Sequence, residues 1–318
     1  MVTDRQLRRS KTIQQRTGRT FHFATRLLPE RVRHPTYVLY AFFRVADEVV
    51  DGATDLGPTE QRERLEQLRA EALGQDDTDD EVLAAFQEVQ ATYDIPEDEI
   101  AQFIDAMLAD VEKDRYDTYE ELRAYMRGSA AAVGVMMQSI MDVDRPEKAT
   151  PHAIALGEAF QLTNFLRDVR EDIRDHDRIY LPKTTRERHG VTEADIESCE
   201  PTDGFRAAVA DELRRADDLY REGVAGIQYL PADCQFAVLY AAVLYAEYHR
   251  LIRNREYDTL SATPELSAPR AVWLYAKTRW YWQWSKDPVT VFRKVSAVPD
   301  NDTDRVERDH PGRTPHAE

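Results

Sequence analysis

The sequence has few cysteines and no long apolar run, and each shortage excludes a class of protein. Cys199 and Cys234 are the only cysteines in 318 residues. They have no paired spacing, which argues against a disulfide framework or a cysteine-ligated metal and favours a reducing, cytoplasmic setting. No window approaches the roughly 18 consecutive apolar residues of a membrane-spanning helix, so we expect none. The polar start MVTDRQLRRSKT also lacks the apolar core of a signal peptide.

Positive charge is also in short supply. The chain has 42 Lys or Arg against 59 Asp or Glu, a net charge of −17. This balance argues against nucleic acid as a partner, because a phosphate backbone requires a basic binding face. Only 7 of the basic residues are lysine, and the acids spread along the whole chain, a pattern typical of proteins adapted to high salt. An ordinary acidic cytoplasmic protein is the alternative.

Alternating patterns typical of strands are rare, whereas apolar residues recur every three or four positions over most of the chain. We therefore predict an all-α fold of about eight to ten helices. The expected helices include residues 35–51, 119–141 and 151–173. We divide the chain into a polar N-terminal segment (1–14), one helical domain (15–295) and a disordered polar tail (296–318), because the tail has no apolar period.

A first acidic motif lies in the expected helix at 35–51. Asp47 and Asp51 are one helical turn apart and so share a face. Acidic pairs at this spacing are common by chance in so acidic a chain. This pair, however, follows the run YVLYAFF and flanks two valines, which indicates a mostly buried helix. Buried carboxylates need a partner, and a cation would serve as one.

A second motif repeats the arrangement at Asn164, Asp168 and Asp172, again with a spacing of four. Two such helices facing each other would form an oxygen-lined pocket suited to Mg²⁺, with Mn²⁺ as the alternative. Arg44 and Arg167 accompany the two motifs, and guanidinium groups bind phosphates in a bidentate manner. The pattern thus predicts a metal and diphosphate site, although salt bridges between helices would also explain it.

At these residues the sequence resembles the squalene/phytoene synthase family of head-to-head prenyl transferases, and within it the phytoene synthases. The stretches that match, besides the first acidic motif, are FATRLLPERVR (23–33), YMRGSAAAVGVMM (125–137) and LGEAFQLTNFLRDVREDIRDHDRIYLP (156–182). The resemblance covers roughly residues 15–285. The middle stretch departs from the family pattern, with Met126 in place of the usual cysteine and Ser129, Ala130 and Ala131 in place of Val-Ala-Gly.

The resemblance implies an isoprenoid synthase fold, a single helical domain around a central cavity. It implies that a Mg²⁺ cluster binds Asp47, Asp51, Asn164, Asp168 and Asp172. It further implies that Tyr40 and Tyr125 act in catalysis beside the four aspartates. The substrate-binding residues that it implies are Phe21, Arg44, Gln161, Asn164, Arg167, Tyr245 and Arg270.

The activity that the resemblance implies joins two molecules of geranylgeranyl diphosphate through prephytoene diphosphate to give phytoene, a carotenoid precursor. Phytoene synthases finish by losing a proton, so we expect no NADPH, and the sequence has no glycine-rich dinucleotide motif. One alternative is a C30 synthase that makes dehydrosqualene or squalene from farnesyl diphosphate. The other is a non-catalytic helical homologue that acts as an assembly factor.

The four tryptophans all lie in the segment AVWLYAKTRWYWQWSK (271–286). Trp273, Trp280 and Trp284 would share one helical face. This face predicts peripheral contact with the inner face of the cell membrane, where the hydrocarbon product could pass to a downstream desaturase. Packing of this helix into the core is the alternative.

Overall fold

The chain folds as a bundle of helices. The computed structural model describes residues 2–17, 23–52 and 56–300. Within these ranges it has fifteen α-helices and no β-strand, which confirms the all-α prediction. The bounds of the longer helices are α1 (Asp4–Thr17), α3 (Glu30–Asp51), α4 (Pro58–Ala72), α5 (Glu81–Tyr93), α6 (Glu97–Asp110), α9 (Pro146–Arg167), α13 (Asp203–Ala225), α14 (Ala232–Asn254) and α15 (Ala268–Trp284).

The number of helices exceeds the eight to ten expected, because two predicted helices are interrupted and several short ones were missed. The predicted helix at 119–141 is α7 (Tyr119–Met126) and α8 (Ala132–Met141), joined by the π-helical turn η1 (Arg127–Ala131). The predicted helix at 151–173 divides into α9 and α10 (Val169–His176). The short helices that were missed are α11 (Lys183–Arg188), α12 (Glu193–Glu197) and α16 (Pro288–Val295).

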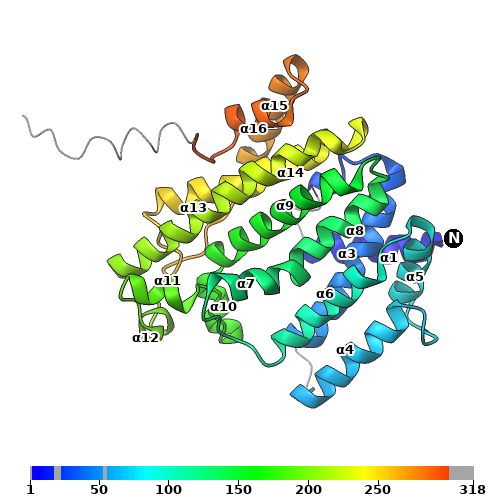
Figure 1. Cartoon of the computed structure of the whole chain (residues 1–318), viewed down its shortest axis with the longest axis horizontal. Coiled ribbons are helices and arrows are strands. Elements are labelled where there is room, and N and C mark those ends of the chain that lie inside the picture. The colour runs from blue at the N-terminus through cyan, green and yellow to red at the C-terminus, as the bar shows by residue number, and fades with distance from the viewer. Residues whose placement is uncertain (1, 18–22, 53–55, 301–318) are drawn as a thin grey trace, which may run out of the picture.

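Helix α9 is the central element (Figure 1). It packs against α13 and the 3₁₀ turn η2 (Gly226–Tyr229) on one side and against α8 and η1 on the other. Glycines permit these close approaches: a Cβ atom at Gly223 would lie 2.7 Å from the backbone of Leu156, and one at Gly157 would lie 2.8 Å from the carbonyl oxygen of Ala130. The helices around α9 are therefore closer than larger residues would allow.

Helix α3 packs against α1, α4, α5, α6 and α8. Its buried face includes Phe42, whose ring stacks on that of Phe86 in α5 with centroids 4.0 Å apart. This packing orients α3, so the position of the first acidic motif depends on an apolar face of the same helix.

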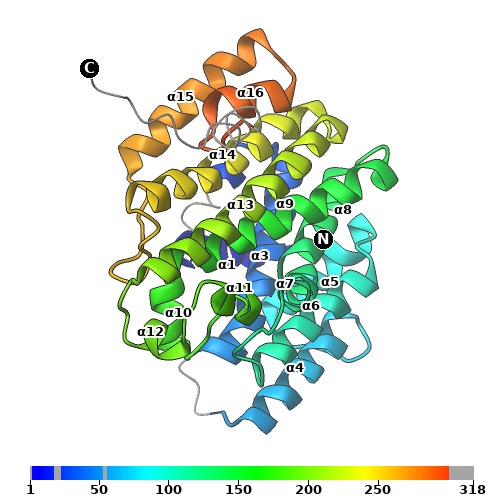
Figure 2. The ribbon, with the colours of Figure 1, turned by 60° about the vertical axis from the view of Figure 1, so that its left-hand side comes forward.

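Helices α15 and α16 lie at one end of the molecule, over α14 (Figures 1 and 2). Leu274, Thr278 and Trp282 form the buried side of α15. No helix in the described part of the chain combines the length and apolar character needed to cross a bilayer. Residues 301–318, most of the predicted tail, lie outside the described residues.

Candidate diphosphate and metal site

The two acidic motifs are bridged by an arginine. Asp51 lies at the end of α3, and the second motif lies where α9 meets α10. Between them, Nη1 of Arg178 is 2.9 Å from Oδ1 of Asp51, and the charge of Arg178 also acts on Asp47 and Asp172. One guanidinium therefore pairs with Asp51 and lies within electrostatic range of Asp47 and Asp172.

The second motif follows a helical path despite an interruption at Asp168. This residue leaves the helical region, with φ −100° and ψ 12°, and separates α9 from α10. Its N–H still donates to the carbonyl of Asn164 at 2.8 Å, and the N–H of Asp172 donates to the carbonyl of Asp168 at 2.9 Å. Because the i to i−4 pattern continues, Asn164, Asp168 and Asp172 stay on successive turns.

Negative charge is crowded in this region. Desolvation raises the pKa of Asp47 to about 7, against the opposing effect of Arg44, and Asp51 contributes to the increase. Desolvation also raises the pKa of Asp172 to about 8, together with the charge of Asp168. Carboxylates with raised pKa values are destabilised in their charged form, so a bound cation would relieve them.

Each motif has an arginine close by. Arg44 makes long ion pairs, 3.7 Å to Asp47 and 3.5 Å to Glu48, so its guanidinium retains donors for another anion. Arg167 forms an ion pair with the adjacent Asp168 and lies over the ring of Tyr248, 4.7 Å from its centroid. Both arginines thus pair with carboxylates. A bound metal ion would compete for those carboxylates, and the guanidinium groups would then be available to bind phosphate oxygens.

The donor set fits Mg²⁺ held in part by substrate. Among the described residues, no three His, Cys, Asp or Glu side chains form a ready-made metal cage. Mg²⁺ does not require one, because it commonly binds one or two carboxylates and completes its octahedron with water and phosphate oxygens. The crowded carboxylates, with their raised pKa values, are the observation that supports this fit.

An aromatic wall adjoins the acidic motifs. The ring of Phe165 stacks on Tyr180 at 3.8 Å, and both lie near Tyr125, at 6.1 and 6.0 Å between centroids. The Tyr125 hydroxyl donates to Oδ2 of Asp110 at 2.7 Å. Desolvation raises the pKa of Asp110 to about 7, although this hydrogen bond opposes the increase. Nη2 of Arg178 reaches the carbonyl of Asp110 at 3.2 Å, which connects the wall to the acidic motifs.

The other predicted residues lie at varied distances from this centre. Tyr245 is partly buried, stacks on Phe160 at 4.5 Å, and interacts electrostatically with Arg167 and Tyr40. Arg270 forms an ion pair of 2.8 Å with the buried Glu247. Glu247 is adjacent in sequence to Tyr248, the residue that lies under Arg167. Gln161 lies on α9, one turn before the second motif. Phe21 lies outside the described residues.

Four residues of this site were not predicted from the sequence: Asp110, Arg178, Tyr180 and Tyr248. Arg178 and Tyr180 belong to the segment RIYLP (178–182), whose match to the family was a usable signal. Asp110 had no comparable signal, since it is one of 59 acidic residues and its role depends on the docking of α6 against α7.

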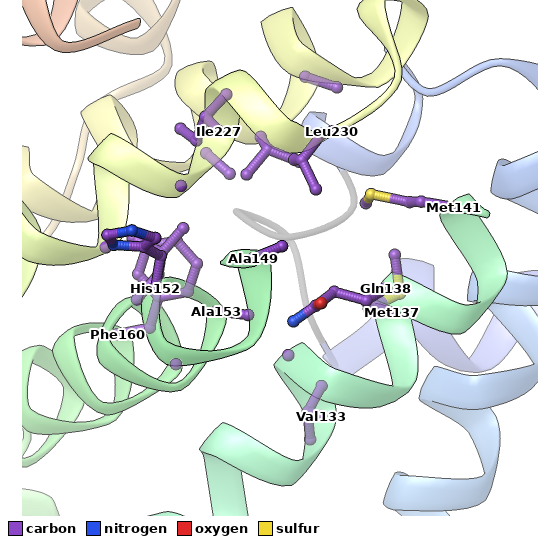
Figure 3. Close-up of a pocket in the computed structure, with 18 of the residues that line it drawn as sticks. Val133, Met137, Gln138, Met141, Ala149, His152, Ala153, Phe160, Ile227 and Leu230 are labelled. Atoms are coloured by element: carbon purple, nitrogen blue, oxygen red, sulfur yellow. The ribbon is translucent and has the colours of Figure 1, made fainter. Parts of the chain in front are cut away.

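An apolar cavity lies along the N-terminal half of α9 (Figure 3). Its volume is about 150 Å³, and part of it is open to solvent. Helices α8, α9 and α14 and the turn η2 form its walls, largely from alanine, glycine, methionine and other apolar residues. Gln138 and His152 are the polar exceptions among the lining residues. This apolar lining suits a hydrocarbon chain.

Comparison with known proteins agrees with this geometry. Residues 14–273 match the family model described as squalene/phytoene synthase. The phytoene synthase of Rhodobacter capsulatus is 33% identical over 83% of this chain and 78% of its own length. The 15-cis-phytoene synthase of Synechococcus elongatus is 32% identical over 78% of this chain and 84% of its own length. A crystal structure of a dehydrosqualene synthase superposes with a TM-score of 0.80 at 26% identity, over 88% of this chain and 98% of its own.

Proposed function

Because this chain belongs to the squalene/phytoene synthase family, we propose that it joins two molecules of geranylgeranyl diphosphate head to head to make phytoene. The product forms through prephytoene diphosphate, with release of two diphosphates and two protons, one as the cyclopropane closes and one in the final step. The observation that carries this proposal is the identity of its relatives: phytoene synthases of bacteria, cyanobacteria and plants match most of the chain. The enzyme is a prenyltransferase of carotenoid biosynthesis.

The first chemical task is to stabilise the departing diphosphate. Mg²⁺, or Mn²⁺ in its place, would be held by Asp47, Asp51, Asn164, Asp168 and Asp172 and would supply positive charge to the diphosphate oxygens. Arg44 and Arg167 lie beside those ligands and would bind further phosphate oxygens. Preorganised positive charge of this kind lowers the barrier to ionisation, because it requires no reorganisation during the reaction.

The second task is to protect the allylic carbocation from water. The aromatic wall of Phe165, Tyr125 and Tyr180 presents ring faces that can stabilise a cation. Asp110 fixes the orientation of the Tyr125 hydroxyl by accepting a hydrogen bond from it. The prenyl chains would extend into the apolar cavity, whose lining has only two polar side chains, Gln138 and His152.

The test is a product assay. Purified protein with Mg²⁺ at high salt, given geranylgeranyl or farnesyl diphosphate separately and without NADPH, should convert the C20 substrate to phytoene. An Asp47→Asn, Asp168→Asn double variant with an unchanged melting temperature should make none, and EDTA should stop the wild type. Dehydrosqualene or squalene from the C15 substrate alone would assign the C30 activity instead. No product from either substrate would favour the non-catalytic homologue.

We also propose that this acidic enzyme works at high salt and contacts the inner face of the membrane through α15. Trp273, Trp280 and Trp284 are 46%, 61% and 76% exposed, in contrast to the buried Trp282. Residues 268–296 have six basic residues and one acidic residue, a net charge of +5 in a chain of −17. Exposed tryptophans among basic residues suit an anionic bilayer surface, from which phytoene could pass to a desaturase.

A further inference from the structure

The side chain of Gln138 is the chemical exception in the apolar cavity. Gln138 lies on α8, is only 5% exposed, and lines the cavity with its amide directed into the space between α8 and α9 (Figure 3). Its Oε1 is 3.3 Å from the hydroxyl of Thr150. Its Nε2 is buried and has no hydrogen-bond partner in the described part of the chain.

Flipping the Gln138 amide, so that Oε1 and Nε2 exchange places, still leaves one of these atoms without a hydrogen-bond partner. Nε2 could then donate to Thr150, but Oε1 would be left without a donor. The Thr150 hydroxyl has one proton, and its shorter contact, 2.8 Å, is to the carbonyl of Pro146. In either orientation, therefore, one end of the Gln138 amide needs a partner that the protein does not supply.

The position of this amide along the cavity relates it to the length of the substrate chain. Thr150, its neighbour on α9, precedes Asn164 by 14 residues, which is about 21 Å along the helix axis. The diphosphate end of the substrate would lie at Asn164, so the amide is near the far end of a prenyl chain extended along α9. Met141, Ala149 and Leu230 line the cavity in the same region.

We propose that Gln138 limits the length of the prenyl chain that the enzyme accepts; this inference rests on the proposed function. A chain that ends before Gln138 leaves room for a water molecule to hydrogen-bond the amide. A longer chain expels that water and leaves the buried amide unpaired against hydrocarbon, which is unfavourable. Gln138 thereby disfavours chains longer than the natural substrate by desolvation, without a steric clash.

The test compares binding of three chain lengths. Non-ionising thiolo analogues of farnesyl, geranylgeranyl and geranylfarnesyl diphosphate (C15, C20 and C25) are titrated calorimetrically, with Mg²⁺, into the wild type and into Gln138→Leu. The variant is nearly the same size and removes the amide. Gln138→Met serves if the leucine variant melts at a lower temperature. Met137→Leu is the matched control, since Met137 is the preceding residue and also lines the cavity.

We expect Gln138→Leu to improve C25 affinity relative to C20 by about tenfold, the size of effect produced by removing one unpaired buried amide. The C15 to C20 ratio should change by less than about twofold, and Met137→Leu should leave both ratios unchanged. An unaltered C25 to C20 ratio in both Gln138 variants would overturn the inference. Because the titration measures binding, it gives an answer even if the product assay fails, so the two failures are distinguishable.

Discussion

Arg178 and Asp51 form an ion pair of 2.9 Å that joins the segment after α10 to the end of α3. The guanidinium is mostly buried, and its second terminal nitrogen holds the carbonyl of Asp110. One side chain therefore connects both acidic motifs with the aromatic wall. The distance between the two motifs, and with it the fit of a metal-bound diphosphate, depends on this contact.

Arg178→Ala should lower kcat by at least about tenfold, because a hydrogen bond to a charged group contributes about 1.5–3 kcal/mol. The variant also leaves Asp51 without its partner, so the Mg²⁺ concentration needed for half-maximal activity should change. Arg174→Ala is the control, since Arg174 is exposed on α10 of the same region. Equal kinetics in the two variants would show that Arg178 does not position the motifs.

The sequence allowed the prediction of those features that depend on local geometry. Spacing of four places Asn164, Asp168 and Asp172 on successive turns whatever the rest of the chain does, and the structure retains that pattern through the break at Asp168. Asp110 and Arg178 could not be found in this way, because their proximity arises from the docking of elements about 70 residues apart in the chain. The unpaired amide of Gln138 likewise depends on tertiary packing, since in the sequence it is one polar residue in an apolar helix.

Asp110 should make stability depend on pH. Its pKa in the folded protein is about 7, above the usual 3.8, so its ionisation is more favourable in the unfolded chain. The contribution of Asp110 to stability is thus most favourable below about pH 4 and declines as pH rises towards 7. Asp110→Asn keeps an acceptor for Tyr125 and removes the titration, and should stabilise the metal-free protein by about 2 kcal/mol more at pH 8 than at pH 5.

Chemical denaturation at the two pH values measures this difference. The control is Asp98→Asn, at an exposed position in the first turn of the same helix, α6. A gain for Asp110→Asn that is the same at both pH values would mean that Asp110 titrates normally in the folded protein.

Gly223 should be required for the close packing of α13 on α9. A methyl group there would lie 2.7 Å from N, Cα and Cβ of Leu156, and backbone atoms cannot move aside cheaply. Gly223→Ala should therefore destabilise the protein by about 1–3 kcal/mol, although alanine is the better helix former. The exposed neighbour Glu222 offers the control, because Glu222→Ala should change stability by less than about 0.5 kcal/mol. A stabilising Gly223→Ala would show that the helices separate readily.

The exposed face of α15 makes a prediction about membranes with two separable parts. In flotation with vesicles, the wild type should bind those that contain anionic lipid more tightly than neutral ones. Trp280→Ser, Trp284→Ser should weaken binding to both by about tenfold, because the two most exposed rings of α15 would no longer enter the interface. Reversing charge at Lys277, Arg279 and Lys286 should remove only the preference for anionic lipid, which high ionic strength should also reduce.

The vesicle experiment has a control in the same chain. Leu56 is 37% exposed and lies two residues before α4, a helix at the end of the molecule opposite α15 (Figure 1). Leu56→Ser removes an exposed apolar side chain elsewhere and should leave vesicle binding unchanged. If the tryptophan variant binds as the wild type does, the exposed face of α15 serves something other than lipid. If Leu56→Ser weakens binding as much as the tryptophan variant does, vesicle binding reflects general surface hydrophobicity and does not depend on the position or charge of α15.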